Sequence, residues 1–352
     1  MKIGINAGYW QAGPPKDMAQ ILVAAERAGV DSFWTAEAYG SDALTPLAWW
    51  GAATSNIRLG TAVMQMSART PTAAAMAAIS MDHLTGGRFI MGLGVSGPQV
   101  VEGWYGQPYG RPLARTREYI DIVRQVFARN APVTYDGQFF KLPLPTQEGN
   151  PLISGLGRPL RSTVHPLRPN LPIHLAAEGP KNIALAAEIA DGWLPAFYSP
   201  RQDQEFRELL AQGFSRRSPE LSAERDFEVS ASVLVAHGQT VKEAADQVRP
   251  VIALYIGGMG AKEANFHRNA IDRLGYAEVC DEVQAKYLAG DKAGAMAAIP
   301  LELIDDIALV GPVDRMAQRL QLWQDTAVTS IIAQGDSTAV RALIAANAQV
   351  QA

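Results

Sequence analysis

The segment from Phe89 to Pro98 joins an apolar run to a glycine-rich turn, and its composition suits a ligand-binding loop. Residues 89–93 are typical of a buried strand, and Gly94-Val95-Ser96-Gly97-Pro98 breaks that strand abruptly. The backbone N–H groups of such a turn stay free, so they can donate hydrogen bonds to an anionic or hydroxylated ligand. We therefore predict a binding loop at Val95, Ser96 and Gly97.

The same segment matches the G-x-G-x-x-G pattern of dinucleotide-binding proteins through Gly92, Gly94 and Gly97. In those proteins the pattern opens a helix at once and usually follows the first strand of its domain. Here Pro98 and the aromatic stretch Gly103-Trp104-Tyr105-Gly106 follow, and three strand–helix units precede the turn. We therefore reject a nicotinamide dinucleotide site on these glycines.

Other residues that could bind a ligand or take part in catalysis lie where further predicted strands end. They are Glu37 and Tyr39, Ala62 and Val63, Ala177-Glu178-Gly179-Pro180-Lys181, and Tyr198. These positions hold almost no His, Cys or Asp, and the five histidines lack ligand spacing, so we predict neither a hydrolytic triad nor a metal site. A site of small residues without a nucleophile suits a planar cofactor that supplies its own chemistry.

The elements that position these residues alternate along the chain. Strands are expected at 3–7, 32–37, 57–64, 89–94, 172–177, 192–197, 228–236 and 330–334. Helices are expected at 17–28, 43–54, 72–83, 113–129, 181–190, 202–213, 240–254 and 313–325. Eight strands alternating with eight helices predict a (β/α)8 TIM barrel, in which active sites lie at the carboxyl ends of the strands.

Two regions exceed what a barrel needs. We expect one TIM-barrel domain over residues 1–352, with insertions at about 142–170 and 257–299 and a small hairpin at 135–139. Long additions on the catalytic face of a barrel usually build lids and substrate walls. His174, inside a predicted strand, is expected to be a core residue rather than a base.

Composition excludes several classes of protein. The 352 residues are 48% hydrophobic, which is ample for a sizeable core, and one cysteine excludes internal disulfides. The net charge of −4 gives no reason to expect nucleic acid or an anionic membrane as a partner. The chain opens with the strand MKIGIN and contains no membrane-spanning run, so we expect a cytoplasmic enzyme that acts on a small molecule.

Several motifs resemble the bacterial luciferase-like flavin and deazaflavin oxidoreductases. They are Ile57-Arg58-Leu59-Gly60-Thr61-Ala62-Val63, Asp82-His83-Leu84-Thr85-Gly86-Gly87-Arg88-Phe89, Gly92-Leu93-Gly94, Glu178-Gly179-Pro180 and Asp191-Gly192-Trp193. The segment from Ser96 to Gly106 resembles the branch that uses coenzyme F-420, which is similar to methylenetetrahydromethanopterin reductase and to the deazaflavin-dependent glucose-6-phosphate dehydrogenase. The resemblance implies an oxidoreductase that transfers hydride between the deazaflavin and a small organic substrate.

The resemblance also implies roles for individual residues. The peptide bond between Ala62 and Val63 should be cis and form a bulge behind the cofactor ring. The ribityl hydroxyls and phosphate should be held by two loops, consisting of Val95, Ser96 and Gly97 and of Ala177, Glu178, Gly179, Pro180 and Lys181. The second loop precedes a helix, whose N-terminal N–H groups favour an anion. Related enzymes pair through barrel helices, which implies a homodimer.

The chain departs from the family after the second strand. The sugar-phosphate dehydrogenases carry an acidic residue and then a catalytic histidine there, whereas this chain has Glu37-Ala38, so an alcohol dehydrogenase of that type is not expected. A reductase needs only hydride and a proton. Glu37 is our first choice of proton donor, because a carboxyl group in an apolar, aromatic-lined site can hold a proton at neutral pH. Its alternative role is to hold a ring hydrogen bond or a structural arginine.

The sequence gives weaker support for the other expected site residues. Tyr39, Glu102 and Tyr198 are further candidate donors, and Trp104 and Tyr105 should line the substrate pocket, since they follow the binding turn. Rival functions are a two-component FMN monooxygenase on the same barrel and a non-catalytic cofactor-binding homologue. The cofactor distinguishes the first rival, because a deazaflavin has carbon in place of the flavin N5 and so passes hydride without activating oxygen.

Overall fold

A computed structural model describes residues 1–10, 12–147, 150–259 and 265–351. Its centre is a closed ring of parallel strands, in which β12 pairs with β1 on one side and with β10 on the other. The eight strands are β1 (Lys2–Gly8), β2 (Ser32–Thr35), β3 (Arg58–Thr61), β5 (Phe89–Gly94), β8 (Ile173–Ala176), β9 (Gly192–Leu194), β10 (Glu228–His237) and β12 (Ser330–Gln334). The predicted (β/α)8 barrel is confirmed, and each expected strand lies within the predicted range or one residue beyond it.

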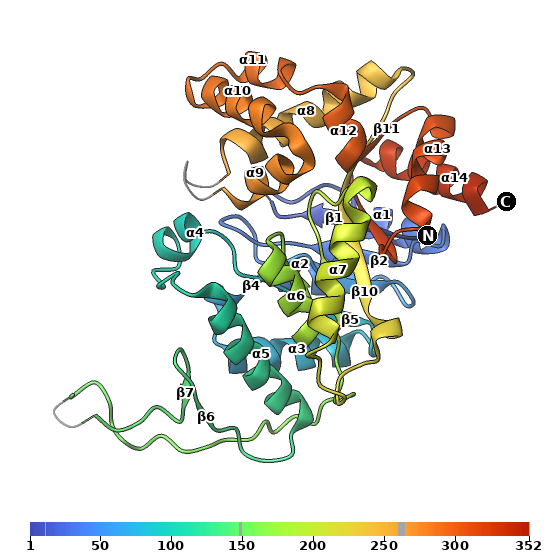
Figure 1. Cartoon of the computed structure of the whole chain (residues 1–352). Helices are drawn as coiled ribbons and strands as arrows, with labels where there is room; N and C mark the ends of the chain where they lie inside the picture. Colours follow the sequence, from blue (N-terminus) through green and yellow to red (C-terminus); the bar gives the residue numbers. More distant parts are fainter. Residues whose placement is uncertain (11, 148–149, 260–264, 352) are drawn as a thin grey trace.

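Helices cover the outside of this ring (Figure 1). The eight expected ones are α1 (Met18–Arg27), α2 (Leu44–Gly51), α3 (Pro71–Leu84), α5 (Pro112–Ala128), α6 (Pro180–Ile189), α7 (Asp203–Phe214), α8 (Val241–Gly257) and α13 (Val313–Gln324). The structure adds α14 (Ser337–Gln351), which follows the last barrel strand and which the sequence pattern did not predict. No helix in the described part of the chain is long and apolar enough to cross a membrane.

The turn after β5 differs from its prediction. A short helix, α4 (Pro98–Gly103), begins directly after Gly97, so the expectation that no helix follows the glycine-rich turn is wrong. Pro98 is compatible with a helix because it occupies the first turn, where its missing N–H has no intrahelical acceptor. The glycines nevertheless have a packing cause. A Cβ on Gly92 would lie 1.7 Å from the Thr61 carbonyl oxygen, and one on Gly94 would lie 2.5 Å from Val63 Cγ2.

The first expected insertion extends from the barrel as an arm (Figure 1). The antiparallel pair β6 (Tyr135–Asp136) and β7 (Lys141–Leu142) leads into it, which confirms the hairpin expected before the insertion. The described residues between 143 and 170 form no helix or strand. Residues 148 and 149 of this insertion lie outside the described residues.

The second expected insertion is helical and has a core of its own. It contains α9 (Phe266–Ile271), the helical turn η4 (Asp272–Tyr276), α10 (Ala277–Leu288) and α11 (Lys292–Ala297), followed by α12 (Leu301–Ile307) and the strand β11 (Ala308–Gly311). These elements and α8 share a cluster of buried apolar side chains that also includes Phe197, just after β9. The inserted helices therefore pack against one side of the barrel mouth; residues 260–264 lie outside the described residues.

His174 is a core residue, as expected. It is 2% exposed and its ring lies 6.1 Å from that of Trp34 inside the barrel. Burial lowers the pKa of His174 to about 4, although the nearby Glu228 carboxylate opposes this shift. The histidine is therefore neutral at physiological pH and has no access to a ligand at the mouth.

Candidate active site

The ends of β3, β5 and β8 form a floor of small side chains at the barrel mouth. The short strand β4 (Met64–Gln65) continues beyond β3 and pairs with the end of β5, which in turn pairs with β8. Ala62, Val63 and Ala176 pack there on an interior cluster of Trp34, Ile90, Leu194 and Ile332. The Ala62–Val63 peptide bond is cis, as the resemblance implied. A floor without bulky or charged groups can accept the face of a flat ring.

Two loops with free amides lie beside this floor. Within the described residues, the backbone N–H groups of Ser96, Gly97, Glu178 and Gly179 donate no hydrogen bond. The loops are neighbours because β5 and β8 pair directly. The second loop continues into α6, whose first turn adds further N–H groups and the positive end of a helix dipole. The arrangement can hold hydroxyl groups and an anion next to a planar ring.

Glu37 is a structural anchor. Its side chain is 3% exposed, and Oε1 accepts hydrogen bonds from Arg69 Nη1 at 2.6 Å and from the Gln65 amide at 2.8 Å. Oε2 accepts from the Ala43 amide at 3.0 Å. The carboxylate thus joins the end of β2 to the start of α2 and to the segment after β4. Both oxygens accept hydrogen bonds from donors of this chain, so the structure supports the structural-arginine role, and proton donation by Glu37 stays a prediction.

Tyr198 lies buried among aromatic side chains, and its expected catalytic role stays a prediction. It is 1% exposed and packs on the rings of Trp193, Phe206 and Trp323, between the barrel and the outer helices. Its hydroxyl donates to the carboxylate of Asp203 on α7. Burial, and then this carboxylate, raise the pKa of Tyr198. The position directly after a strand suggested the mouth, but the side chain belongs to the packing layer.

The remaining expected residues stay near the mouth or on its rim. Tyr39 is 57% exposed and its ring lies 6.4 Å from that of Tyr9. Tyr105 donates from its hydroxyl to the carbonyl of Ala38 at 3.1 Å, which ties the segment after α4 to the end of β2. Trp104 is largely exposed, and exposed Glu102 accepts from the Tyr109 amide at 3.3 Å.

The helical insertion brings two groups to the mouth that sequence reasoning missed. His267 of α9 places Nδ1 2.6 Å from Glu178 Oε1, and its ring meets that of Tyr255 edge-on at 4.7 Å. Arg273 donates to the Glu178 carbonyl at 2.6 Å. No motif or short spacing links Glu178 to these residues in the sequence. Only the folding of the insertion against the barrel brings them together.

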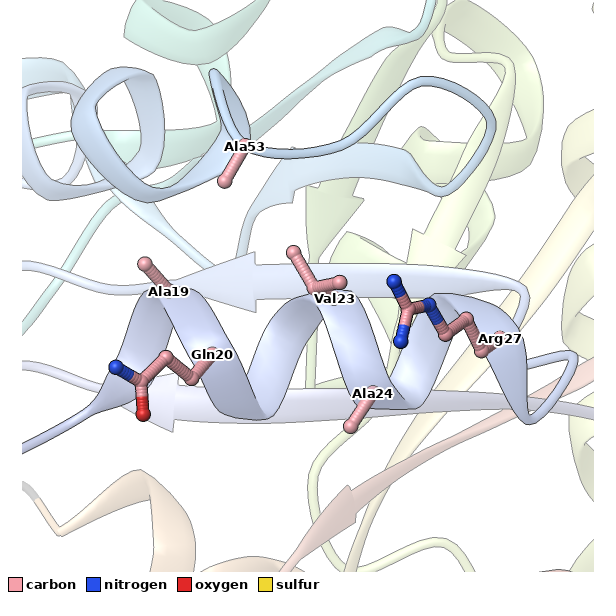
Figure 2. A pocket seen from close by; sticks show the side chains of 6 residues that line it. All are labelled: Ala19, Gln20, Val23, Ala24, Arg27 and Ala53. Carbon is pink, nitrogen blue, oxygen red and sulfur yellow. The ribbon is translucent and has the colours of Figure 1, made fainter.

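A hollow elsewhere on the surface is a poor alternative site. It has a volume of about 490 Å³ and lies between α1 and the end of α2 (Figure 2). Its lining consists of Ala19, Gln20, Val23, Ala24, Arg27 and Ala53. These residues belong to the outer helical layer and include no acid, base or nucleophile, apart from the permanently charged arginine. The barrel mouth therefore remains the candidate active site.

Comparison with known proteins places the chain in a family. A model of the luciferase-like monooxygenases matches residues 1–330, and the chain belongs to this family, which confirms the resemblance. A Mycobacterium tuberculosis protein, whose name gives coenzyme F-420-dependent oxidoreductase as its proposed activity, is 54% identical over 346 residues, or 98% of each chain. The 5,10-methylenetetrahydromethanopterin reductase of Archaeoglobus fulgidus is 26% identical over 310 residues, which cover 88% of this chain and 86% of the relative.

The fold is also found among solved structures. The coenzyme F-420-dependent tetrahydromethanopterin reductase from Methanopyrus kandleri superposes with a TM-score of 0.78 at 19% identity, covering 97% of both chains. At this identity the similarity shows the shared barrel.

Proposed function

We propose that the barrel mouth binds coenzyme F-420 and that the chain transfers hydride between this deazaflavin and a small organic substrate. The observation that carries the proposal is the floor of Ala62, Val63 and Ala176 beside two loops with free amides. The relative that is 54% identical supports the choice of cofactor. Coenzyme F-420 supplies a two-electron hydride carrier that does not activate oxygen.

The residues present fit such a cofactor. Ala62, Val63 and Ala176 would support the ring, and the Ser96 and Gly97 amides would bind ribityl hydroxyls. The Glu178 and Gly179 amides would bind the phosphate, with the first turn of α6 and the Lys181 side chain adding positive potential. Val95, Ala177 and Pro180 would shape the two loops. A Cβ on Gly179 would meet no atom within 4 Å, so space beside this amide is open.

Cofactor binding is tested by titrating the protein with F-420, FMN and NADPH, following fluorescence and the melting temperature. We expect F-420 to raise the melting temperature, since a ligand at about 100 times its Kd stabilises the folded state by about 2.7 kcal/mol. Gly179→Asp should weaken F-420 binding at least about tenfold, because a carboxylate would face the phosphate. Gly103→Asp on α4 is the matched control, since its Cβ also meets open space.

Any other result of this titration favours one of the rival functions. Binding of FMN without F-420 would favour the two-component monooxygenase. Binding of neither would contradict a flavin-type cofactor. Turnover is then tested by following the oxidation of reduced F-420 with acetone, cyclohexanone, 2-cyclohexen-1-one and the cyclic imine 3,4-dihydroisoquinoline. Binding without turnover of any of these would favour the non-catalytic homologue.

We also propose that the chain forms a homodimer through α2, α3 and the arm. Large apolar side chains stand exposed on these elements, notably Trp49 at 80% and Leu152 at 91%. Others on the same elements are Met76, Leu84, Leu156 and Leu160. Folded monomers rarely expose large contiguous apolar patches, and a dimer contact would bury these side chains.

The dimer is tested by light scattering at micromolar concentration. We expect twice the chain mass for the wild type and a monomer for the double variant Trp49→Arg/Leu156→Asp, because charges in an apolar contact remain desolvated and unpaired. The control is Leu288→Asp on α10, an exposed leucine outside these elements. A monomeric wild type would contradict the proposal.

A further inference from the structure

His267 is fixed at the barrel mouth from three sides. Its Nδ1 lies 2.6 Å from Glu178 Oε1, and its ring meets Phe197 at 6.0 Å and Tyr255 at 4.7 Å, both nearly edge-on. These contacts come from the loops after β8 and β9 and from α8. They hold the imidazole plane in place and leave Nε2 available to a ligand. Within the described residues, Nε2 makes no hydrogen bond. The side chain is 32% exposed, so this nitrogen has a route to solvent or ligand.

The neighbours of His267 make it suitable to carry a proton. Burial by itself lowers the pKa of His267, but the Glu178 carboxylate outweighs this effect and raises it above the ordinary histidine value. Among the described residues, two tyrosines also belong to this part of the mouth: burial raises the pKa of Tyr255 to about 12 and also raises that of Tyr9. Arg273 donates a hydrogen bond to the carbonyl of Glu178. His267 therefore holds its proton to a higher pH than an ordinary histidine does, which suits a group that must donate one.

We propose that His267, held by Glu178, is the proton donor to the substrate, a compound with a polarised C=O or C=N bond. This inference rests on the proposed function. Reduction adds a hydride to the carbon of that bond and moves the π electron pair onto the heteroatom. The heteroatom takes the proton from Nε2 of His267 and becomes O–H or N–H. The neutral imidazole then recovers a proton from water, with Nδ1 kept toward Glu178 throughout.

The location of Glu178 and His267 supports donation of a proton to the substrate. Glu178 belongs to the loop whose amides lie beside the floor, so His267 stands next to the proposed cofactor site rather than on a remote surface. Tyr255 of α8 holds the other side of the imidazole, with ring centroids 4.7 Å apart.

The first test needs no substrate. In an NMR titration of the histidine rings, His267→Gln identifies the His267 signal among the five histidines. We expect that signal to titrate above 6.5 in the wild type and to shift to lower pH in Glu178→Gln, since the amide no longer stabilises the imidazolium. A His267 midpoint at or below 6.5 that Glu178→Gln leaves unchanged would overturn the inference, whether or not F-420 binds.

The second test uses whichever of the four acceptors the wild type reduces fastest. A general acid must be protonated, so kcat/KM should fall as pH rises through the His267 midpoint, and this limb should move to lower pH in Glu178→Gln. His267→Gln should reduce kcat by about 10²–10⁴-fold, remove the limb and leave the F-420 affinity within about threefold. His83→Gln is the control, because His83 lies on α3 and bonds the His165 carbonyl.

Different results would contradict F-420 binding and the proton-donor role of His267. Loss of F-420 binding in the wild type contradicts the proposed function, while the NMR titration still decides whether Glu178 controls the proton on His267. Normal binding with an unchanged pH limb in both variants, or undiminished turnover in His267→Gln, overturns only the inference about His267.

Discussion

Replacing Gly92 by alanine is expected to lower the free energy of unfolding by about 3 kcal/mol or more, since overpacking of a close-packed interior is costly. The new Cβ would lie 1.7 Å from the Thr61 carbonyl oxygen and 2.9 Å from Leu194 Cδ1. The strands cannot separate freely, because Thr61 and Gly92 exchange two hydrogen bonds. Thr61 Oγ1 donates to the Gly92 carbonyl at 2.7 Å, and the Gly92 amide donates to Thr61 Oγ1 at 2.9 Å.

Urea denaturation followed by circular dichroism measures this effect. The matched control is Gly103→Ala, whose Cβ meets no atom within 4 Å and which lies in α4. We expect the control to keep or slightly increase stability, because alanine favours helix. Equal stability of both variants would show that the glycines of this turn serve a ligand rather than the packing of β3 against β5.

The second large effect is expected at Glu37. Glu37→Leu should lower the free energy of unfolding by about 3 kcal/mol, because breaking a buried ion pair leaves the partner charge uncompensated. That partner is Arg69, whose side chain is only 22% exposed. The amides of Ala43 and Gln65 would lose their acceptor as well.

Glu37→Gln separates the anchoring role from catalysis. It keeps an oxygen acceptor and removes the charge, so we expect a smaller loss of stability and a kcat within about tenfold of the wild type. A general acid would contribute about 10²–10⁴-fold, so a loss of that size with full stability would restore Glu37 as the proton donor. The double variant Glu37→Leu/Arg69→Met should lose less stability than Glu37→Leu, because the unpaired charge is removed too.

Much of the fold could be predicted from sequence because its signals are local. A buried strand is a short apolar run, and an amphipathic helix repeats within four residues, so both can be recognised in a window of about a dozen residues. The alternation of these signals predicted the barrel, and glycine with proline predicted the loops after β5 and β8. The sequence pattern does not predict α14 or the start of α4. Pro98 is typical of a break in a helix, but here it stands in the first turn of one.

Fewer features of the site could be predicted, since the direction of a side chain is not a local property. Glu37 and Tyr198 each follow a strand, and position alone placed both at the mouth. In the structure Glu37 pairs with Arg69, just before α3, and Tyr198 bonds Asp203 at the start of α7, so partners from other segments set both side-chain directions. Tyr39, two residues beyond Glu37, is the one of the three that stays exposed beside the mouth.

The sequence by itself determined the alternation of strands and helices that indicates a barrel, and the two glycine-containing loops, since each depends on residues close together in the chain. Only the tertiary structure decided which groups meet. Gly92 is glycine because β3 lies against it, and Glu178 faces His267 because a helical insertion packs on the mouth. Such contacts join residues far apart in sequence through close packing and hydrogen bonding, and no spacing along the chain encodes them.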